Sequence, residues 1–382
     1  MSDKVAVLGA GVTLFERQAT RRLDEMASEA VSLALRDAGL SYGDIEVAFV
    51  ANAYRSGSAP IVFYKLSRTG IPITHIDIAC ASGTRSVQLA GHLIASGAYQ
   101  TCLVVGVEMM PGGMVPWPID PEAVSLYHEM MFDTVTGLLT MPGAYAYKAV
   151  RYMHDFGATP EQFAHVAVKN HRNSCLNPNA MYRKEFSIEE VLGSRMICYP
   201  LTLFQCCANS NGAAAVVLSS ESLARRHTSQ PVLLSGWGET SMRFDPVDPV
   251  ESHLSEGDTV AAAAGAYEMS GAGPGDADLA QVHDAFSAAE VLQIEALGLC
   301  GKGEGAAFTA AGNTEIGGRI PVNTDGGLMG CGHPVGASGC RMVAEVCSQL
   351  KGQAGARQVE GARLGLVQNS GLGASNVLVL ER

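Results

Sequence analysis

Apolar residues near the start of the chain recur at the spacing of one helical face. Between positions 22 and 38 they follow the i, i+3, i+4, i+7 rule, at Leu23, Met26, Ala27, Ala30, Val31 and Ala34. This pattern predicts an amphipathic helix. Apolar runs at 101–105, 214–218 and 363–367 instead predict buried strands. Because strand-helix-strand units follow one another, the pattern predicts an α/β fold.

The chain also contains an internal repeat. Residues 81–87 read Ala-Ser-Gly-Thr-Arg-Ser-Val, and residues 337–343 read Ala-Ser-Gly-Cys-Arg-Met-Val. Upstream of each copy lie a helix-like stretch ending in glycine, at Gly39 or Gly273, then an acidic turn and a strand. We therefore expect two α/β halves of similar topology, at 1–228 and 229–382. The first half would hold an insertion at about 111–204, where a lid or substrate cover is expected.

Composition narrows the classes of function. Of the 382 residues, 47% are hydrophobic and only 17% are charged, which excludes a disordered chain. The formal net charge is −12 and no lysine- or arginine-rich run occurs, so nucleic acid is not an expected partner. The sequence shows neither a run of 18 apolar residues nor a signal-peptide pattern. We therefore expect no membrane association and a cytoplasmic location.

The cysteines do not form a disulfide or metal-binding pattern. Ten of them lie irregularly spaced, mostly inside apolar segments, and we interpret them as reduced thiols. There is no C-x-x-C pair or H-x-x-x-H spacing, so no metal site is expected. Gly9-Ala10-Gly11 resembles the start of a dinucleotide-binding loop, but Leu14 stands where the third glycine belongs. A dinucleotide cofactor is therefore not expected.

Cys80 lies at a strand-to-helix junction. It follows the run Ile76-Asp77-Ile78-Ala79 and precedes the predicted helix that opens near Ser82. The unpaired N–H groups and the dipole of a helix N-terminus lower the pKa of a nearby thiol, which favours Cys80 as a nucleophile. The alternative is a small buried cysteine of the core.

His333 leads into the second copy of the repeat much as Cys80 leads into the first. Six glycines surround it between positions 323 and 339, which allows the backbone to approach a ligand or another segment closely. If the halves are related by a pseudo-twofold axis, the two helix starts face each other and bring thiol and imidazole together. The alternative is a histidine that only packs a turn.

His283 follows a predicted strand at 278–282. Catalytic and binding groups of α/β proteins gather at the carboxyl ends of strands. Ser287 and Glu290 predict a capping box at the start of the next helix. Asp284 between them is expected to have a mainly structural role.

These residues resemble the motifs of the thiolase superfamily over nearly the whole chain. Cys80-Ala81-Ser82-Gly83 resembles its nucleophile motif, and Gly332-His333-Pro334 with Gly336-Ala337-Ser338-Gly339 resembles its histidine motif. Gln368-Asn369-Ser370-Gly371-Leu372-Gly373 is similar to its C-terminal glycine loop. His283-Asp284-Ala285-Phe286 stands where the sterol-carrier-protein-2 subgroup has His-Asp-Cys-Phe.

The resemblance implies a five-layered αβαβα fold, a homodimer core and Claisen-type chemistry on acyl-CoA. Coenzyme A would be a substrate, and no permanently bound cofactor is implied. Cys80 would carry the acyl group, His333 would activate it, and His283 would orient a water or donor in an oxyanion hole. The resemblance further implies an oxyanion or loop role for Gly332, Ser370, Gly371 and Gly373, and substrate or cofactor binding by Asp284, Phe286 and Gly336.

One departure from the family pattern concerns acid–base chemistry. Thiolases have a second cysteine, either in the C-terminal loop or in His-Asp-Cys-Phe, where this chain has Ser370 and Ala285. The proton would then travel through His283, His333, Cys331 or water, or the reaction would not need it.

This departure leaves three functions open. The first is a thiolase-type acyltransferase, the second a thiolase-like carbon–carbon lyase, and the third a non-catalytic CoA-binding subunit. The resemblance also makes a small zinc-ribbon and OB-fold partner subunit plausible. Aromatic residues of the insertion would suit an aromatic or polycyclic acyl group but equally a core, namely Trp117, Tyr127, Phe132, Tyr145, Tyr147 and Tyr152.

Overall fold

One mixed sheet organises the molecule. The computed structural model describes the chain except for residues 1–3, 55–58, 67–68, 113–139, 242–255 and 372. Among the described residues, nine strands join in the order β3-β2-β4-β7-β1-β8-β11-β10-β9. They are β1 (Val5–Val12), β2 (Val47–Ala51), β3 (Ile73–Ile76), β4 (Thr101–Met109), β7 (Asn211–Ser220), β8 (Val232–Ser241), β9 (Leu279–Gln281), β10 (Leu364–Gly371) and β11 (Ala374–Glu381). A separate pair consists of β5 (Met196–Cys198) and β6 (Leu201–Thr202).

The sheet consists of two halves with the same pairing pattern. They meet where β1 runs antiparallel to β8, with Val5 opposite Leu234. On one side of β1, antiparallel ladders join β1 to β7 and β7 to β4, and β4 then pairs parallel to β2. On the other side, antiparallel ladders join β8 to β11 and β11 to β10, and β10 then pairs parallel to β9. Even the outermost parallel pair, β2 with β3, has a counterpart in the single bridge between Ala280 and Val322. This repeated pairing confirms that the chain has two α/β halves of similar topology, whereas their bounds at 1–228 and 229–382 stay a prediction.

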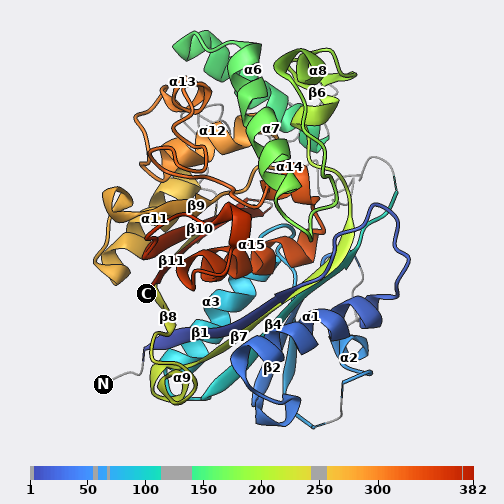
Figure 1. Ribbon diagram of the computed structural model, residues 1–382, viewed down its shortest axis with the longest axis vertical. Coiled ribbons are helices and arrows are strands. Elements are labelled where there is room, and N and C mark those ends of the chain that lie inside the picture. The colour runs from blue at the N-terminus through green and yellow to red at the C-terminus, as the bar shows by residue number, and fades with distance from the viewer. Residues whose placement is uncertain (1–3, 55–58, 67–68, 113–139, 242–255, 372) are drawn as a thin grey trace, which may run out of the picture.

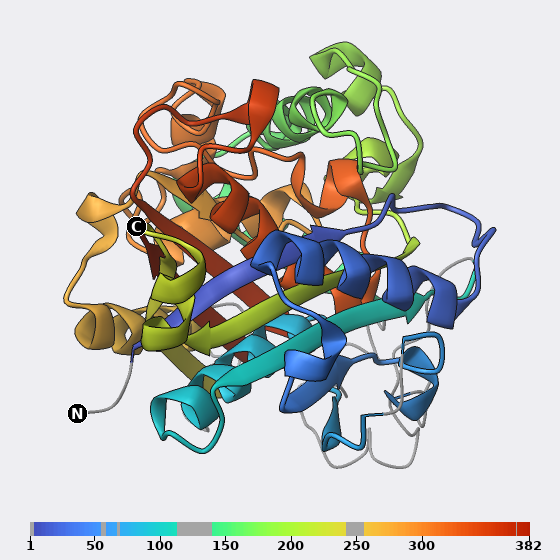
Figure 2. The same cartoon turned by 60° about the horizontal axis from the view of Figure 1, so that its bottom comes forward.

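Helices separate and cover the two halves of the sheet, which gives five layers. On the outside of the first half lies α1 (Leu23–Ala38), packed on β1, β7 and β4 (Figure 2). Between the halves lie α3 (Ser82–Ala95) and α15 (Val335–Leu350), and outside the second half lies α11 (Gly257–Ser270) (Figure 1). The α/β class and the five-layered αβαβα arrangement are therefore confirmed.

Strand residues alternate between the layers, as period-two geometry requires. In β1, Val5 and Val7 face the middle helices, whereas Ala6 and Leu8 face α1. The remaining long strands of both halves alternate in the same way. Since both faces are covered, these strands have nearly continuous apolar sequences.

A helical cap lies next to the second half of the sheet, above β9 and β10 in Figure 1. The insertion contributes α6 (Met141–Phe156), α7 (Pro160–Cys175) and α8 (Ile188–Leu192), and the second half contributes α12 (Ser287–Ala296), α13 (Gly305–Ala310) and α14 (Gly327–Cys331). Shorter elements are α2 (Ala59–Val62), α9 (Glu221–His227), η1 (Tyr42–Asp44), η2 (Leu203–Gln205), η3 (Pro274–Asp276) and η4 (Gly355–Arg357). Trp117, Tyr127 and Phe132 lie outside the described residues, whereas Tyr145 packs with the cap's apolar core.

Two local predictions were wrong. Ser287 is the first residue of α12 rather than its cap, and it accepts a hydrogen bond from Gln205 Nε2 at 3.2 Å. Glu290 instead forms a buried ion pair with Lys169 of α7, which attaches α12 to the cap. Likewise α11 ends at Ser270, with Gly271 in the left-handed region at φ 74°, two residues before the predicted Gly273. In the first case tertiary contacts of Ser287 and Glu290 replaced the predicted capping box, and in the second the left-handed turn at Gly271 ended the helix early.

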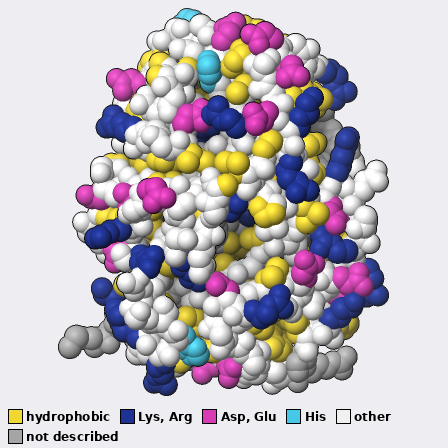
Figure 3. Space-filling model, viewed as in Figure 1, with side chains coloured by type: hydrophobic (Ala, Val, Ile, Leu, Met, Phe, Trp, Pro, Cys, Tyr) yellow, Lys and Arg dark blue, Asp and Glu magenta, His cyan; other side chains and the backbone are white. Residues whose placement is uncertain are grey.

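On the face shown in Figure 3, acidic and basic side chains are interspersed rather than gathered into a basic patch. Of the helices that the structure describes, none has the length and apolar character needed to cross a bilayer.

Within the middle layer, α3 and α15 approach each other closely enough for their backbones to touch. A Cβ on Gly339 would lie 2.4 Å from the amide nitrogen of Thr84, and one on Gly83 would lie 2.8 Å from that of Cys340. These glycines occupy the same position in the two copies of the repeat. The repeated Ala-Ser-Gly therefore marks the crossing point of the two helices.

Gly339→Ala is expected to lower the free energy of unfolding by about 1–3 kcal/mol, because its methyl group would overlap a backbone atom. Urea denaturation measures the change. Gly275→Ala is the matched control, since nothing lies within 4 Å of its added Cβ, and should stay within about 0.5 kcal/mol of the parent. Equal loss of stability in both variants would contradict the role of this crossing.

Candidate active site

Cys80 sits on a strained turn between β3 and α3. Ala79 has a φ of 52°, in the left-handed region, which costs about 1–2 kcal/mol for a residue with a Cβ. Asp77 Oδ1 accepts the Ala79 N–H at 3.0 Å. Ser82 Oγ accepts the Ile78 N–H at 2.9 Å and donates to the Ala79 carbonyl at 2.6 Å. The turn is thus fixed from both sides, and the half-buried Cys80 lies directly before the helix.

His333 contacts this thiol. Its Nε2 lies 3.1 Å from Cys80 Sγ, and its Nδ1 lies 2.7 Å from Ser338 Oγ. The single hydroxyl hydrogen of Ser338 is donated to the Pro334 carbonyl at 3.0 Å, so Ser338 must accept from Nδ1–H. In neutral His333 this leaves the lone pair on Nε2, where it can accept the Cys80 proton. The pair therefore has the geometry of a nucleophile and its base.

Tertiary contacts hold His333 in place. Its backbone N–H donates to the Ala208 carbonyl at 3.0 Å, and Gly332 before it has a φ of 93°. The fully buried Asp284 accepts the N–H groups of Leu328 at 2.6 Å and Met329 at 3.3 Å, at the start of α14. Asp284 thereby anchors the helix that delivers His333.

The electrostatics of the pair differ from the prediction. Burial, with the charges of Glu108 and Asp77, raises the pKa of Cys80 to about 12. Burial, with His283 and Arg341, lowers the pKa of His333 well below its usual value. The prediction that the helix start lowers the pKa of the Cys80 thiol is wrong here, because desolvation raises this pKa by more than the helix N-terminus lowers it. The resting pair is therefore a neutral thiol and a neutral imidazole.

His283 is the third member of the site. Asn369 Nδ2 donates to the Cys80 carbonyl at 2.8 Å, so its Oδ1, 2.7 Å from His283 Nδ1, must accept from that nitrogen. Burial lowers the pKa of His283 to about 4, so the ring is neutral and its Nε2 carries a lone pair. As the ring stands, Nε2 can orient a water or accept a proton, but it cannot donate to an oxyanion.

The sulfur of Cys80 and one nitrogen of each imidazole lie within 4.8 Å of one another. These atom types could also ligate a soft divalent ion. The absence of a resident metal stays a prediction.

The other predicted site residues lie around this centre in different environments. Phe286 is buried and packs against Tyr145, with ring centroids 4.8 Å apart. Gly371 lies against the nucleophile turn, since a Cβ there would be 2.3 Å from the Ile78 carbonyl oxygen. Ser370 Oγ instead accepts from Gln368 Nε2 at 2.7 Å. Gly373 follows with a φ of 64°.

Two predicted glycines have their N–H groups already bonded. That of Gly332 donates to the Leu328 carbonyl at 3.0 Å, within its own loop. That of Gly336 donates to Glu108 Oε2 at 3.1 Å, and a Cβ on Gly336 would lie 2.4 Å from the Ala51 carbonyl oxygen. Both glycines therefore shape the backbone around His333.

Sequence reasoning missed Glu108, Ser338 and Asn369 as site residues. Glu108 is fully buried at the end of β4 and accepts the N–H groups of Ala53 at 2.9 Å and of Gly336, which joins both halves. An acidic residue in an apolar strand could have signalled this role. The functions of Ser338 and Asn369 depend on contacts between distant segments, which the sequence does not display.

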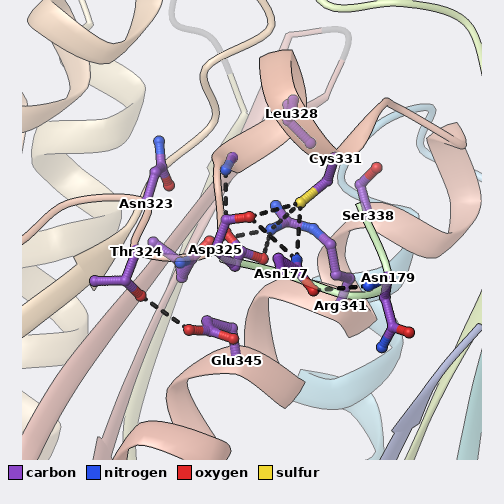
Figure 4. Close-up of polar contacts among 12 residues, drawn as sticks. Asn177, Asn179, Asn323, Thr324, Asp325, Leu328, Cys331, Ser338, Arg341 and Glu345 are labelled. Carbon is purple, nitrogen blue, oxygen red and sulfur yellow. Dashed lines mark hydrogen bonds and ion pairs between the residues drawn. The ribbon is translucent and has the colours of Figure 1, made fainter. Parts of the chain in front are cut away.

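Cys331 belongs to a different cluster (Figure 4). Its thiol donates to the Asp325 carbonyl at 3.1 Å and accepts from Asn177 Nδ2 at 3.3 Å. In the figure this sulfur points toward Asp325 and Arg341, whereas the Ser338 hydroxyl points away from them. A cavity of about 360 Å³ beside the cluster is lined by Asp325 and Arg341, but not by Cys80, His283 or His333. The geometry therefore argues against Cys331 as the proton carrier.

Comparison with known proteins identifies matching family domains, related sequences and a similar solved structure. Residues 5–194 match the thiolase N-terminal domain and residues 251–382 the thiolase C-terminal domain-like family. The chain is 34% identical to sterol carrier protein 2 of Bos taurus over 100% of this chain and 73% of that protein. It is 36% identical to acetyl-CoA acetyltransferase of Methanothermobacter thermautotrophicus over 96% of each chain.

Two further matches concern assemblies. The benzoylsuccinyl-CoA thiolase subunit BbsB of Thauera aromatica is 35% identical over 94% of this chain and 92% of that one. Among solved structures, a chain of the Ltp2–ChsH2 (DUF35) aldolase superposes with a TM-score of 0.86 at 28% identity, covering 99% of this chain and 97% of that chain.

The neutral state of the pair predicts a pH profile for alkylation of Cys80 by iodoacetamide. Because a raised pKa keeps the thiolate fraction small, the rate should rise about tenfold per pH unit between about pH 6 and pH 9. His333, with its lowered pKa, is neutral over this range and adds no step. Mass spectrometry of the Cys80 peptide gives the rate, with Cys80→Ala as background. A plateau that begins below pH 7 would instead show a preformed thiolate–imidazolium pair.

Proposed function

Because this chain belongs to the thiolase family, we propose that it is an acyl-CoA C-acyltransferase that cleaves or forms a β-ketoacyl-CoA through a thioester on Cys80. The observation that carries the proposal is the 3.1 Å contact between Cys80 Sγ and His333 Nε2, with Ser338 fixing the imidazole tautomer. In this arrangement the lone pair on His333 Nε2 faces the Cys80 thiol, so His333 can accept its proton. The relatives named as thiolases or acetyltransferases support the same reaction class.

The geometry suits a nucleophile that is activated only when substrate is present. His333 Nε2 takes the thiol proton as Cys80 attacks the substrate carbonyl, and Ser338 stabilises the imidazolium through Nδ1. The negative charge then lies on the tetrahedral oxygen. His283 can hold a water at Nε2, and the second hydrogen of that water can stabilise the oxyanion.

The cap favours a bulky acyl group. The rings of Tyr145 and Phe286 pack at a tilt with centroids 4.8 Å apart. Burial, followed by the neighbouring Glu256 and Cys80, raises the pKa of Tyr145 well above its usual value. Tyr145 offers an apolar ring near the Cys80–His333 pair, and Phe286 supports it from within the cap. We therefore extend the proposal to aromatic or polycyclic acyl groups, with coenzyme A as acceptor or donor and no permanently bound cofactor.

A carbon–carbon lyase is the second candidate. The aldolase superposition and the replacement of both usual second cysteines, by Ser370 and Ala285, favour it. The intact contact between Cys80 and His333 favours acyl transfer, because a retro-aldol cleavage needs no acyl-enzyme. We keep the acyltransferase as the leading function.

We also propose a homodimer and a small partner subunit of zinc-ribbon and OB-fold type. β3 is an edge strand of the sheet, and Ile73 on it is 36% exposed. An exposed apolar edge next to the site is a suitable surface for a second copy. The names of two similar proteins, one a subunit and one a DUF35 complex, support the partner.

Incubation with an acyl-CoA is expected to leave an acyl adduct on Cys80, detected by mass spectrometry after denaturation and digestion. Cys80→Ala should form no adduct and lose acyl transfer completely. Its fold should persist, because the smaller side chain fits the same turn, and circular dichroism checks this. Carbon–carbon cleavage by the wild type without any adduct would favour the lyase.

The assembly proposal predicts a mass by light scattering of about twice the 40.0 kDa of one chain. Ile73→Lys should shift the protein toward monomer, because the edge would then carry a charge. Val260→Lys is the control, since Val260 is 52% exposed on the outer helix α11. A monomeric wild type at micromolar concentration would refute the dimer.

A further inference from the structure

A short segment, residues 206–209, lies along the site. It contains Cys207, whose thiol has no role in the activation of Cys80 by His333. His333 donates its backbone N–H to the Ala208 carbonyl, and a β-bridge joins Asn209 to His333. One step earlier, the Cys207 N–H donates to the Ala285 carbonyl at 2.8 Å. The segment therefore touches both the base of the nucleophile and the motif that contains His283.

The register of this contact decides where the thiol points. Cys206 and Phe286 form an isolated antiparallel bridge, and continuing its register by one residue, as the Cys207 N–H to Ala285 carbonyl bond does, places Cys207 opposite Ala285. Directly opposed residues of an antiparallel pair point to the same face, with Cβ atoms about 4.5–5.5 Å apart. Cys207 thus presents its thiol on the face to which Ala285 contributes only a methyl group.

Cys206 points the other way. Its backbone is extended, so its side chain lies on the opposite face from that of Cys207. Consistent with this, Cys206 Sγ donates to the Thr202 carbonyl at 3.3 Å, within the cap. The side chains of the two neighbouring cysteines therefore leave the segment on opposite faces, although both border the apolar cluster of the cap.

Electrostatics support the placement of Cys207 near the nucleophile. Burial raises the pKa of Cys207 well above its usual value, and the ionisable neighbours Cys206, Cys80 and Asp284 raise it further. A neutral thiol is the form that can donate a proton.

We propose that Cys207 is the second acid/base of the reaction, supplied from the 206–209 segment opposite Ala285. The proposal rests on the acyltransferase function. In cleavage, Cys80 gives its proton to His333 and adds to the β-carbonyl; the Cα–Cβ bond then breaks, leaving an acyl thioester on Cys80 and an electron pair on the α-carbon. Cys207 S–H protonates that carbon and becomes a thiolate.

The second half of the reaction restores both groups. The Cys207 thiolate takes the proton of the coenzyme A thiol, and the coenzyme A thiolate attacks the acyl group on Cys80. Cys80 leaves as a thiolate and recovers its proton from the His333 imidazolium. The cycle is balanced with coenzyme A as the only co-reactant.

Two assays separate this inference from the function on which it rests. p-Nitrophenyl acetate acetylates Cys80 with a leaving group that needs no proton, so its burst reports on Cys80 and His333 alone. Exchange of the methyl hydrogens of acetyl-CoA in D₂O reports on the group that handles the α-proton. An absent burst with no Cys80 adduct would refute the proposed function itself.

Cys207→Ala should keep the burst but slow both the exchange and thiolysis by about 100-fold or more, the usual contribution of a general acid or base. Cys206→Ala, the matched control, should stay within about threefold in all assays. Adding Ala285→Cys to Cys207→Ala should recover at least tenfold, because the thiol returns to the same face from the other strand.

Cys207→Ser, which keeps the side-chain size, should remain slow even if Cys207→Ala folds poorly. A Cys207→Ala or Cys207→Ser variant that exchanges within threefold of the wild type overturns the proposal. So does a wild type that acylates Cys80 but does not exchange the α-hydrogens.

Discussion

The contact of α3 with α15 at Gly83 and Gly339 is the constraint on which the site depends. The two helices cross so closely that a Cβ at either position would overlap backbone. Both helices begin at the site, so their crossing fixes the distance between the Cys80 turn and His333. Backbone contact of this kind tolerates little variation, because a packed interior cannot expand to admit a methyl group without strain.

Close packing also excludes water from the site, which explains why Cys80 and His333 are both neutral before substrate binds. A buried thiolate and imidazolium would each lose hydration, and the charge of Glu108 acts against the thiolate. The proton therefore stays on Cys80 until a substrate carbonyl can receive the negative charge. Ser338 and Asn369 prepare for that step by fixing the tautomers of His333 and His283. Orientation, rather than a lowered thiol pKa, prepares the nucleophile.

Polar contacts attach the cap to the active-site segments. Lys169 of α7 pairs with Glu290 of α12, and Glu290 also accepts hydrogen bonds from Asn170 and Asn323 at 2.8 Å. Each partner compensates for the burial of the other, so removal of one would leave an uncompensated charge. Because α12 follows the His283 motif directly, this network sets how the cap meets the site. It also explains why Glu290 was unavailable for the predicted capping box.

The sequence by itself determined the α/β class, the two similar halves and the residues of the nucleophile and histidine motifs. Periodicity and the Ala-Ser-Gly repeat are local signals, so one chain displays them. The protonation state of Cys80 and the tautomers of His333 and His283 required the tertiary structure. So did the placement of Cys207 opposite Ala285, because these residues are 78 positions apart. Burial and cross-strand register depend on how distant segments meet, and no local pattern records that.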